Sequence, residues 1–351
     1  MRKHYLAKLF IILFAAVAIQ GCSPKDLGSI SVLQTPYALY FCDSNGVVGH
    51  TNDGLNFGVA DFAADGVPSK ALLVSGNNLM MLKSRAYVSV GNSNQFNPTY
   101  ENPNPIAFGP SCVLNSNSGR VYMASSVSGS GIVYSDQHCA VNSWQEDFNF
   151  PSTDTVNPGG GVIGNQMTSF AQLQNSTIFG YDWVHKSLYT TGGGNSPWTR
   201  VNYAAGSSDT LPTSTAGPFH IFHINNDLVA LDYLGLQGGW HSGNNGQTWY
   251  KYTGLPARPL NCGAAPFEQV FLVGTDSAGV YMLQAGGNFV PSNNGIDPGS
   301  SVGGIVSKQN LYEGGSTQQY IYIATSSGLY RSFDLGFNWT KIKKGNFYAV
   351  Q

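Results

Sequence analysis

Seven aromatic residues recur along the chain at intervals of 39 to 54 residues, each after a short turn-forming segment. A run of alternating β-branched or aromatic residues around a polar or glycine turn precedes most of them, which predicts a β-hairpin. A repeat of roughly 40–50 residues suits a four-stranded propeller blade, which needs its neighbours to bury both faces. The sequence therefore predicts an all-β chain folded as a seven-bladed β-propeller. The seven aromatic residues are Phe57, Phe96, Trp144, Trp198, Trp249, Phe289 and Trp339.

The turn is most complete before Trp339, where Ser332, Asp334, Gly336 and Trp339 are spaced as S-x-D-x-G-x-x-W. An Asp side chain in a turn can accept hydrogen bonds from backbone N–H groups just downstream. Glycine two residues later allows a positive φ, and the aromatic residue buries apolar surface beneath the turn. These residues therefore predict a staple between two antiparallel strands. A second copy has Ser242, Asn244, Gly246 and Trp249.

This pattern resembles the Asp-box, or BNR repeat, of sialidases, sortilin-type receptors, xyloglucanases and photosystem assembly factors. The resemblance covers residues 29–342 as repeats, and two copies match the motif well. In these families the turns join the third and fourth strands of each blade, on the face opposite the ligand site. The resemblance implies that six residues are structural: Asn244, Gly246, Trp249, Asp334, Gly336 and Trp339.

Closure of the ring has two candidates. A propeller usually closes by sharing one blade between both chain ends. Either Ser29–Gln34 or Phe347–Val350 could be the innermost strand of blade 1. The spacing favours Ser29–Gln34, which would leave the C-terminal segment to add elsewhere or to displace it.

The N-terminal sequence is typical of an export signal. Three basic residues precede an apolar run, Leu9–Ile19, that is too short for a typical transmembrane span. The run ends in Ile-Gln-Gly-Cys22, which resembles the bacterial lipobox, in which the cysteine is acylated and becomes the first residue. The resemblance implies a signal peptide over residues 1–21, lipid on Cys22, a tether over 22–28 and a propeller over 29–351. Ser23 in place of Asp favours the outer membrane of the cell envelope. An ordinary secretory signal cleaved elsewhere is the alternative.

Charge excludes one class of partner. Residues 1–21 hold three of the 17 basic residues and none of the 19 acidic ones, so the remainder has a formal charge of −5. Only Lys341, Lys343 and Lys344 form a basic cluster. Nucleic acid is therefore not an expected partner.

Four cysteines follow Cys22, and export would permit disulfides. Three pairings are possible, and Cys112 with Cys139 is preferred because both fall within one proposed blade. Cys42 and Cys262 belong to blades that do not touch, so we expect buried free thiols there. No C-x-x-C or His/Cys cluster indicates a metal site, and no cofactor is expected.

A catalytic set is not evident in the sequence. The resemblance to sialidases would imply an arginine triad, a Tyr/Glu nucleophile pair and an acid/base Asp, but only five arginines follow residue 21. Glycosidases need a positioned pair of carboxylates. Glu101, Asp154 and Asp209 lie on candidate loops, yet no spacing pairs them. We therefore assign no catalytic residue.

Three long connections crowd one sector of the face opposite the turns, namely Asn97–Pro110, Phe150–Gln166 and Val201–Gly217. Loops of this length are often functional. An exposed Trp on a nearby hairpin tip could stack on a sugar or anchor a protein, or it could pack between blades. His220 and His223 are expected to be packing or channel residues. The candidate binding residues are Tyr100, Asp154, Asp182, Trp183, His185, Tyr203, Asp209 and Trp240.

Three functions fit these observations. The first is a lipid-anchored envelope module that binds or assembles a protein or glycan, without catalysis. The second is an exported glycan-active hydrolase of the sialidase or xyloglucanase kind, which would need acids that converge at the channel mouth. The third is a structural subunit of an envelope complex, which would show a broad apolar patch.

Overall fold

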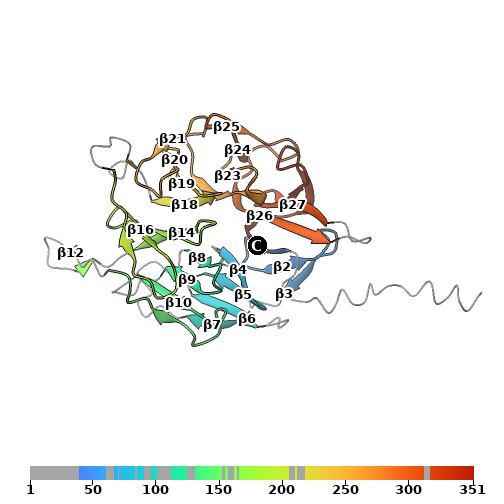
Figure 1. Cartoon of the computed structure of the whole chain (residues 1–351). Helices are drawn as coiled ribbons and strands as arrows, with labels where there is room; N and C mark the ends of the chain where they lie inside the picture. Colours follow the sequence, from blue (N-terminus) through green and yellow to red (C-terminus); the bar gives the residue numbers. More distant parts are fainter. Residues whose placement is uncertain are drawn as a thin grey trace, which may run out of the picture.

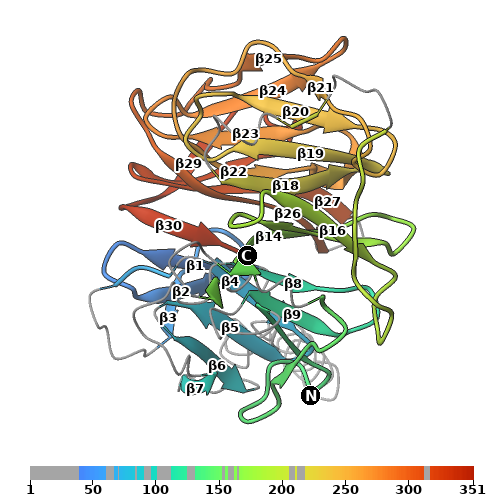
Figure 2. The same ribbon diagram turned by 90° about the vertical axis from the view of Figure 1, so that its left-hand side faces the viewer.

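The computed structural model describes residues 39–60, 67–69, 71–83, 85–90, 96–100, 112–124, 131–151, 155–156, 162–163, 166–204, 210–211, 218–311 and 317–351. Seven four-stranded antiparallel sheets stand around a central axis as a seven-bladed β-propeller (Figure 1). Figure 2 shows the same blades after a 90° turn, seen from the side of the ring. The predicted fold class is confirmed.

The four strands of each blade follow one another from the central axis to the rim. Blade 1 has β30 (Phe347–Val350), β1 (Leu39–Asp43), β2 (Val48–Thr51) and β3 (Gly58–Ala60). Blade 2 has β4 (Ala71–Ser75), β5 (Asn78–Leu82), β6 (Ala86–Val90) and β7 (Asn97–Tyr100). Blade 3 has β8 (Val113–Asn115), β9 (Val121–Ala124), β10 (Ile132–Ser135) and β11 (Gln145–Glu146). Blade 4 has β14 (Met167–Gln172), β15 (Ile178–Asp182), β16 (Ser187–Thr191) and β17 (Thr199–Arg200).

The other three blades follow the same order. Blade 5 has β18 (Phe219–Ile224), β19 (Asp227–Asp232), β20 (Gly239–Ser242) and β21 (Tyr250–Lys251). Blade 6 has β22 (Leu260–Ala264), β23 (Leu272–Thr275), β24 (Val280–Gln284) and β25 (Asn288–Pro291), with a short 3-10 helix, η2 (Pro266–Glu268), between the first two. Blade 7 has β26 (Val302–Leu311), β27 (Thr317–Thr325), β28 (Gly328–Ser332) and β29 (Thr340–Lys344). A small hairpin, β12 (Thr155–Val156) and β13 (Val162–Ile163), lies in the connection between blades 3 and 4.

The ring closes through the C-terminal strand. β30 pairs antiparallel with β1, and backbone hydrogen bonds of 2.8 and 2.9 Å join Tyr40 and Gln351 in both directions. Phe347 is buried and meets Phe41 edge to face, with ring centroids 5.3 Å apart. The expectation that Ser29–Gln34 would be the innermost strand is therefore wrong, because β30 already fills that place with buried side chains. Ser29–Gln34 itself lies outside the described residues.

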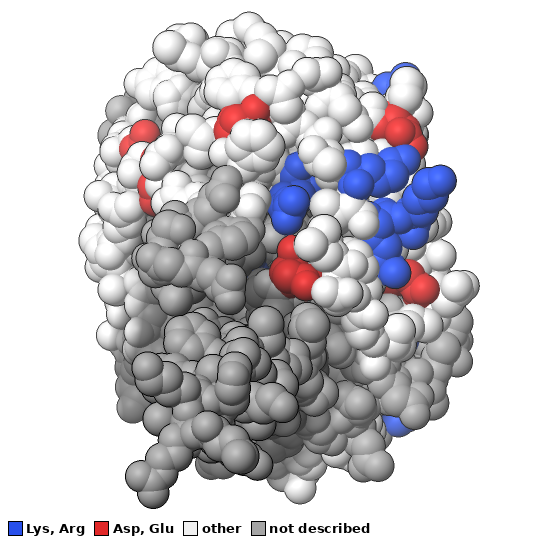
Figure 3. Space-filling model, turned by 90° about the vertical axis from the view of Figure 1, so that its right-hand side faces the viewer, with Lys and Arg blue, Asp and Glu red and all other residues white. Residues whose placement is uncertain are grey.

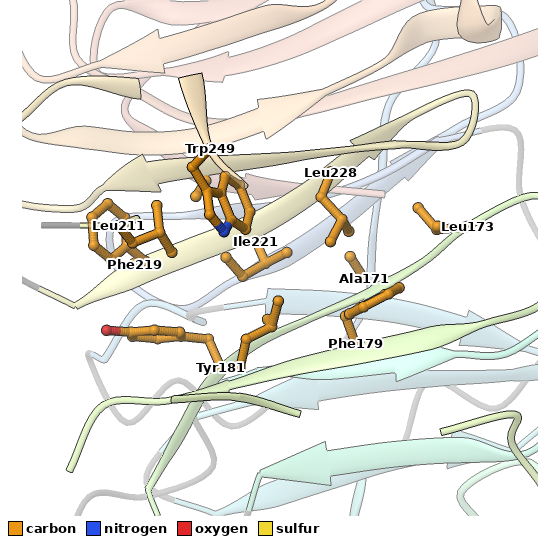
Figure 4. Close-up of a cluster of buried hydrophobic side chains, with 11 residues drawn as sticks. Ala171, Leu173, Phe179, Tyr181, Leu211, Phe219, Ile221, Leu228 and Trp249 are labelled. Carbon is orange, nitrogen blue, oxygen red and sulfur yellow. The ribbon is translucent and has the colours of Figure 1, made fainter. Parts of the chain in front are cut away.

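The core is divided among the interfaces between blades. Seven clusters of buried side chains are found among the described residues, and each joins one blade to the next. Figure 4 shows the cluster between blades 4 and 5, where Trp249 lies with Ile221 and faces Tyr181 of the other sheet. Stability therefore depends on contacts between sheets, since a lone sheet would expose its apolar faces.

All seven recurring aromatic residues occupy equivalent places. Each follows the turn between the third and fourth strands and packs in the interface with the preceding blade. Trp249 reaches blade 4, and Trp339 reaches blade 6, where its indole N–H donates to the backbone oxygen of Ser292 at 2.9 Å. The other five are Phe57, Phe96, Trp144, Trp198 and Phe289.

The turn chemistry is nearly identical in blades 7 and 5. Asp334 Oδ1 accepts from the Asn338 N–H at 2.9 Å, and Asn244 Oδ1 accepts from the Thr248 N–H at 2.9 Å. The preceding serine hydroxyl accepts from the glycine N–H in both turns, at 2.9 Å. These glycines have φ of 92° and 81°, a region that favours glycine.

Blade 1 uses a shorter form of this turn. Thr51 Oγ1 accepts from the Gly54 N–H at 2.9 Å, and Asp53 Oδ1 accepts from the N–H groups of Leu55 and Asn56. Alignment on Phe57 places His50 and Asn52 at the serine and aspartate positions, so the sequence pattern misses Asp53. One residue fewer in the turn accounts for the shift.

We predict a pH-dependent contribution from Asp334. Burial alone would raise the pKa of its carboxyl, but hydrogen bonds from Asn338 and Ser332 outweigh this and lower the pKa below the ordinary value of 3.8. The stability it adds is therefore present above pH 3.8 and is lost as the pH falls through the lowered value. Urea unfolding should show that Asp334→Asn costs more stability at pH 7 than at pH 3. Asn244→Ala is the control, with equal cost at both, and a pH-independent cost of Asp334→Asn would contradict the prediction.

The predicted disulfide between Cys112 and Cys139 is wrong, because both residues are thiols. Cys139 is buried between blades 2 and 3, whereas Cys112 packs between blades 3 and 4. The two sulfurs thus lie on opposite sides of one sheet. Cys42 and Cys262 are thiols too, as expected. Across the described residues, no helix has the length and apolar character needed to span a membrane.

Candidate functional site

The propeller has two distinct faces. We call the face with the turns between third and fourth strands the turn face, and the face with the blade-to-blade connections the connection face. Strands alternate in direction, so turns between the second and third strands also lie on the connection face. The central channel has a cavity at each of its mouths, one on each face.

The described members of the predicted rim set lie in two places: Tyr100 in blade 2, and the others around the boundary of blades 4 and 5. Asp154 and Asp209 lie outside the described residues. Tyr100 ends β7, the outermost strand of blade 2, and Trp240 lies within β20, so neither occupies the loop or tip expected for it. Tyr203 lies beside blade 4 and is partly exposed. Partial burial raises the pKa of its phenol, and the nearby positive charge of Arg200 lowers it by a smaller amount.

Asp182 and His185 do come together, but they form a turn. The buried Asp182 carboxylate accepts from the N–H groups of Gln166 and Val184, each at 3.0 Å. His185 Nδ1 lies 2.5 Å from the other carboxylate oxygen. Both oxygens of the Asp182 carboxylate therefore accept hydrogen bonds or pair within the turn, and the carboxylate has a structural role. Trp183 and Trp240 pack against the cluster between blades 4 and 5, which favours the packing alternative over exposed anchors.

The cavity on the connection face has a volume of about 550 Å³. Its described lining comes from blades 5, 6, 7 and 1, through the starts of inner strands and the turns beside them, and from Ser69 next to blade 2. The side chains that matter most are those of His220, Tyr233, Asn261, Asp276, Asn346 and Tyr348. They are spread over more than 120 residues of sequence, and only the ring brings them together.

Two groups define the chemistry of this cavity. Desolvation by burial lowers the pKa of His220 to about 4, so its imidazole is neutral at pH 7 and offers one donor and one acceptor. The ring lies against that of Tyr233, with centroids 5.1 Å apart. Asp276 Oδ1 accepts from the hydroxyls of Ser301 at 2.5 Å and Ser277 at 3.2 Å. The described lining thus holds one carboxylate and no Lys or Arg side chain.

The cavity on the turn face, about 630 Å³, has a different lining. It is rich in primary amides, with Asn115, Asn117, Gln172 and Gln174 among the described residues. His223 Nε2 lies 3.1 Å from Glu268, whose other carboxylate oxygen accepts from the Asn225 N–H. Glu268 and Phe267 both have a φ of 55°, a strained value for non-glycine residues. The His223–Glu268 pair thus joins blades 5 and 6 beside this mouth.

The two histidines therefore both line the channel, at opposite mouths. His220 belongs to the connection-face cavity and His223 to the turn-face cavity. Within the described residues, no group of three or more His, Cys, Asp or Glu side chains is placed to hold a metal ion.

Basic side chains of blade 7 gather on its outer edge, next to blade 1 (Figure 3). Several are already engaged. Arg331 lies over the ring of Tyr320 at 4.7 Å, and Lys343 over that of Phe57 at 4.7 Å. Lys341 pairs with Asp297. This rim is built from β28 and β29 and lies away from the residues that line the connection-face cavity.

No family model matches this chain, and no curated protein matches it. Solved structures do resemble it. The extracellular domain of BT4673 from B. thetaiotaomicron gives a TM-score of 0.53 at 14% identity, over 80% of this chain and 35% of that one. This chain therefore spans about a third of that domain. YCF48 bound to D1 peptide gives 0.51 at 12% identity, over 80% of this chain and 85% of that one.

A third likeness is to a protein from Bacteroides uniformis named as a 6-phosphogluconolactonase. It gives a TM-score of 0.51 at 12% identity, over 89% of this chain and 98% of that one. An extracellular domain, a peptide-bound protein and a protein named for an enzyme thus share the architecture. Such likenesses show the propeller fold, and function has to be argued from the site.

Proposed function

We propose that the chain is a binding module of the bacterial cell envelope that receives a protein or glycan partner at the connection-face cavity. The observation that carries this proposal is the lining of that cavity. Half-exposed tyrosine rings stand beside polar groups, and the described lining has a single carboxylate. Hydrolysis of a glycoside by the usual mechanism needs two carboxylates, so this lining supports binding over catalysis.

The position of the cavity supports the same proposal. We propose that the recurring turns are Asp-box repeats, whose families bind ligands on the opposite face. The connection-face cavity lies on that opposite face. A structurally similar protein, YCF48, is described bound to D1 peptide, which favours a protein partner for this chain too.

We further propose that residues 1–21 are a lipoprotein signal peptide, that Cys22 carries lipid and that residues 22–28 tether a propeller of residues 29–351. Cys22 lies outside the described residues. The described chain enters β1 at Leu39, which pairs with Thr51 at the turn face. A lipid on Cys22, in the outer membrane, would thus connect to the turn face and leave the connection-face cavity free for a partner.

Replacement of the lipidated cysteine tests the anchor. Cys22→Ser should move the protein from the membrane fraction to the soluble fraction, because acylation needs that thiol. Membrane fractionation of cells that express each variant gives the measurement, with metabolic labelling by a fatty-acid analogue. Cys112→Ser is the matched control and should stay in the membrane fraction with its label. Retention of Cys22→Ser in the membrane would refute lipid attachment at this residue.

A further inference from the structure

We propose that the connection-face cavity binds a cationic side chain, a Lys or Arg of a peptide segment from the partner. This inference rests on the proposed binding function and names its ligand class. The juxtaposition that carries it is one carboxylate, Asp276, in the same cavity lining as two half-exposed tyrosines, Tyr233 and Tyr348, at the mouth of the channel.

The charge of Asp276 is not compensated within the cavity. Its described hydrogen bonds come from two serine hydroxyls, both on the same oxygen, and no described lining residue is a Lys or Arg. A hydroxyl satisfies a lone pair but brings no positive charge. An ammonium or guanidinium group supplies both a donor and a charge, and such hydrogen bonds are the stronger ones. An anionic ligand would be repelled by the same carboxylate.

The aromatic walls suit the same kind of ligand. The side chains of Tyr233 and Tyr348 are 40% and 46% exposed, so their rings remain open to contact. A cation over a tyrosine face is attracted by the ring quadrupole, and the methylene stem of Lys or Arg packs on apolar surface. The neutral imidazole of His220 adds hydrogen-bonding capacity without a competing positive charge.

The remaining lining can hold the peptide around that side chain. The cavity volume of about 550 Å³ exceeds the needs of one side chain and falls in the usual range for ligand pockets. Asn346 and Ser326 at its edge are exposed amide and hydroxyl groups that can bond to a peptide backbone. The Asn261 amide donates to the backbone oxygen of Val302 at 3.1 Å, which leaves its carbonyl oxygen for the ligand.

The test compares two probes of equal shape and different charge. N-acetyl-arginine methylamide and N-acetyl-citrulline methylamide are titrated by calorimetry into the purified full-length mature protein in detergent. We expect arginine to bind about tenfold more tightly at low salt, because it alone makes the charge-assisted hydrogen bond. Asp276→Asn should abolish this preference. Asp227→Asn is the matched control, since this exposed carboxylate lies at the opposite, turn-face end of blade 5.

A second variant guards against a change of fold. Tyr348→Ala removes a half-exposed ring and should weaken arginine binding several-fold while the melting temperature stays close to wild type. Equal binding of the two probes, or an arginine preference that survives Asp276→Asn, would overturn the proposed ligand class. If cellotetraose binds and Asp276→Asn leaves that binding intact, the cavity is a glycan site. The proposed binding function would then be kept and the cationic ligand class rejected. Absence of binding by all three probes would overturn both proposals.

Discussion

Removal of residues 346–351 is expected to lower the melting temperature by roughly 10–20 °C, or to abolish a cooperative transition. The deletion strips three buried side chains, those of Phe347, Ala349 and Val350, from the two interfaces of blade 1. Full burial of an aliphatic or aromatic side chain contributes about 1.5–3 kcal/mol, and 1 kcal/mol shifts the transition by about 2–4 °C in a chain of this size. The inner edge of β1 would also lose its backbone partners. Calorimetry or circular dichroism during heating gives the measurement.

The control for this deletion keeps the strand and removes one exposed side chain. Tyr348 lies on β30 with its side chain 46% exposed, so Tyr348→Ala should leave the melting temperature nearly unchanged. The backbone hydrogen bonds between β30 and β1 persist in this variant. A deletion mutant that melts like the wild type would show that β30 does not close the ring.

Trp339→Ala should reduce the free energy of unfolding by about 3–5 kcal/mol, the usual cost of truncating a buried large aromatic residue. The side chain of Trp339 is 5% exposed and packs with Leu272, Ile296 and Ile323 between blades 6 and 7. Its indole N–H also donates to Ser292, so the variant leaves a buried backbone oxygen with one partner fewer. Urea denaturation followed by tryptophan and tyrosine fluorescence gives the difference.

The same turn offers a matched control. Phe337 lies two residues earlier, and its side chain is 57% exposed. Phe337→Ala should change the free energy of unfolding by less than about 0.5 kcal/mol, as is usual for surface substitutions. Similar small effects of Trp339→Ala and Phe337→Ala would contradict the assigned role of Trp339 as the pin between blades.

The number of blades could be predicted because its signal is local and repeated. Each turn is followed within a few residues by its aromatic residue, and Trp249 of blade 5 and Trp339 of blade 7 occupy equivalent interfaces with the preceding blade. Closure has no such signal. Ser29–Gln34 and Phe347–Val350 are both short segments that could form a strand, and only pairing across nearly the whole chain decides between them.

The proposed binding site was harder to predict for a similar reason. Long loops and hairpin tips pointed to Asp182 and Trp183, whose polar and aromatic groups are used by the turn and by packing. His220, Asp276 and Tyr348 carry no mutual spacing in the sequence and meet only at the axis. The Cys112–Cys139 pair was predicted because both residues belong to one blade. That prediction failed because the sequence does not show on which side of the sheet each side chain lies.

The closing strand also completes the lining of the connection-face cavity. Asn346 and Tyr348 of the connection-face cavity lie at or in β30, which is synthesised after every other described strand. A chain still in transit through a ribosome or an export channel therefore carries most of its sheets but only part of this pocket. The described lining of this cavity is therefore complete only after the ring has closed.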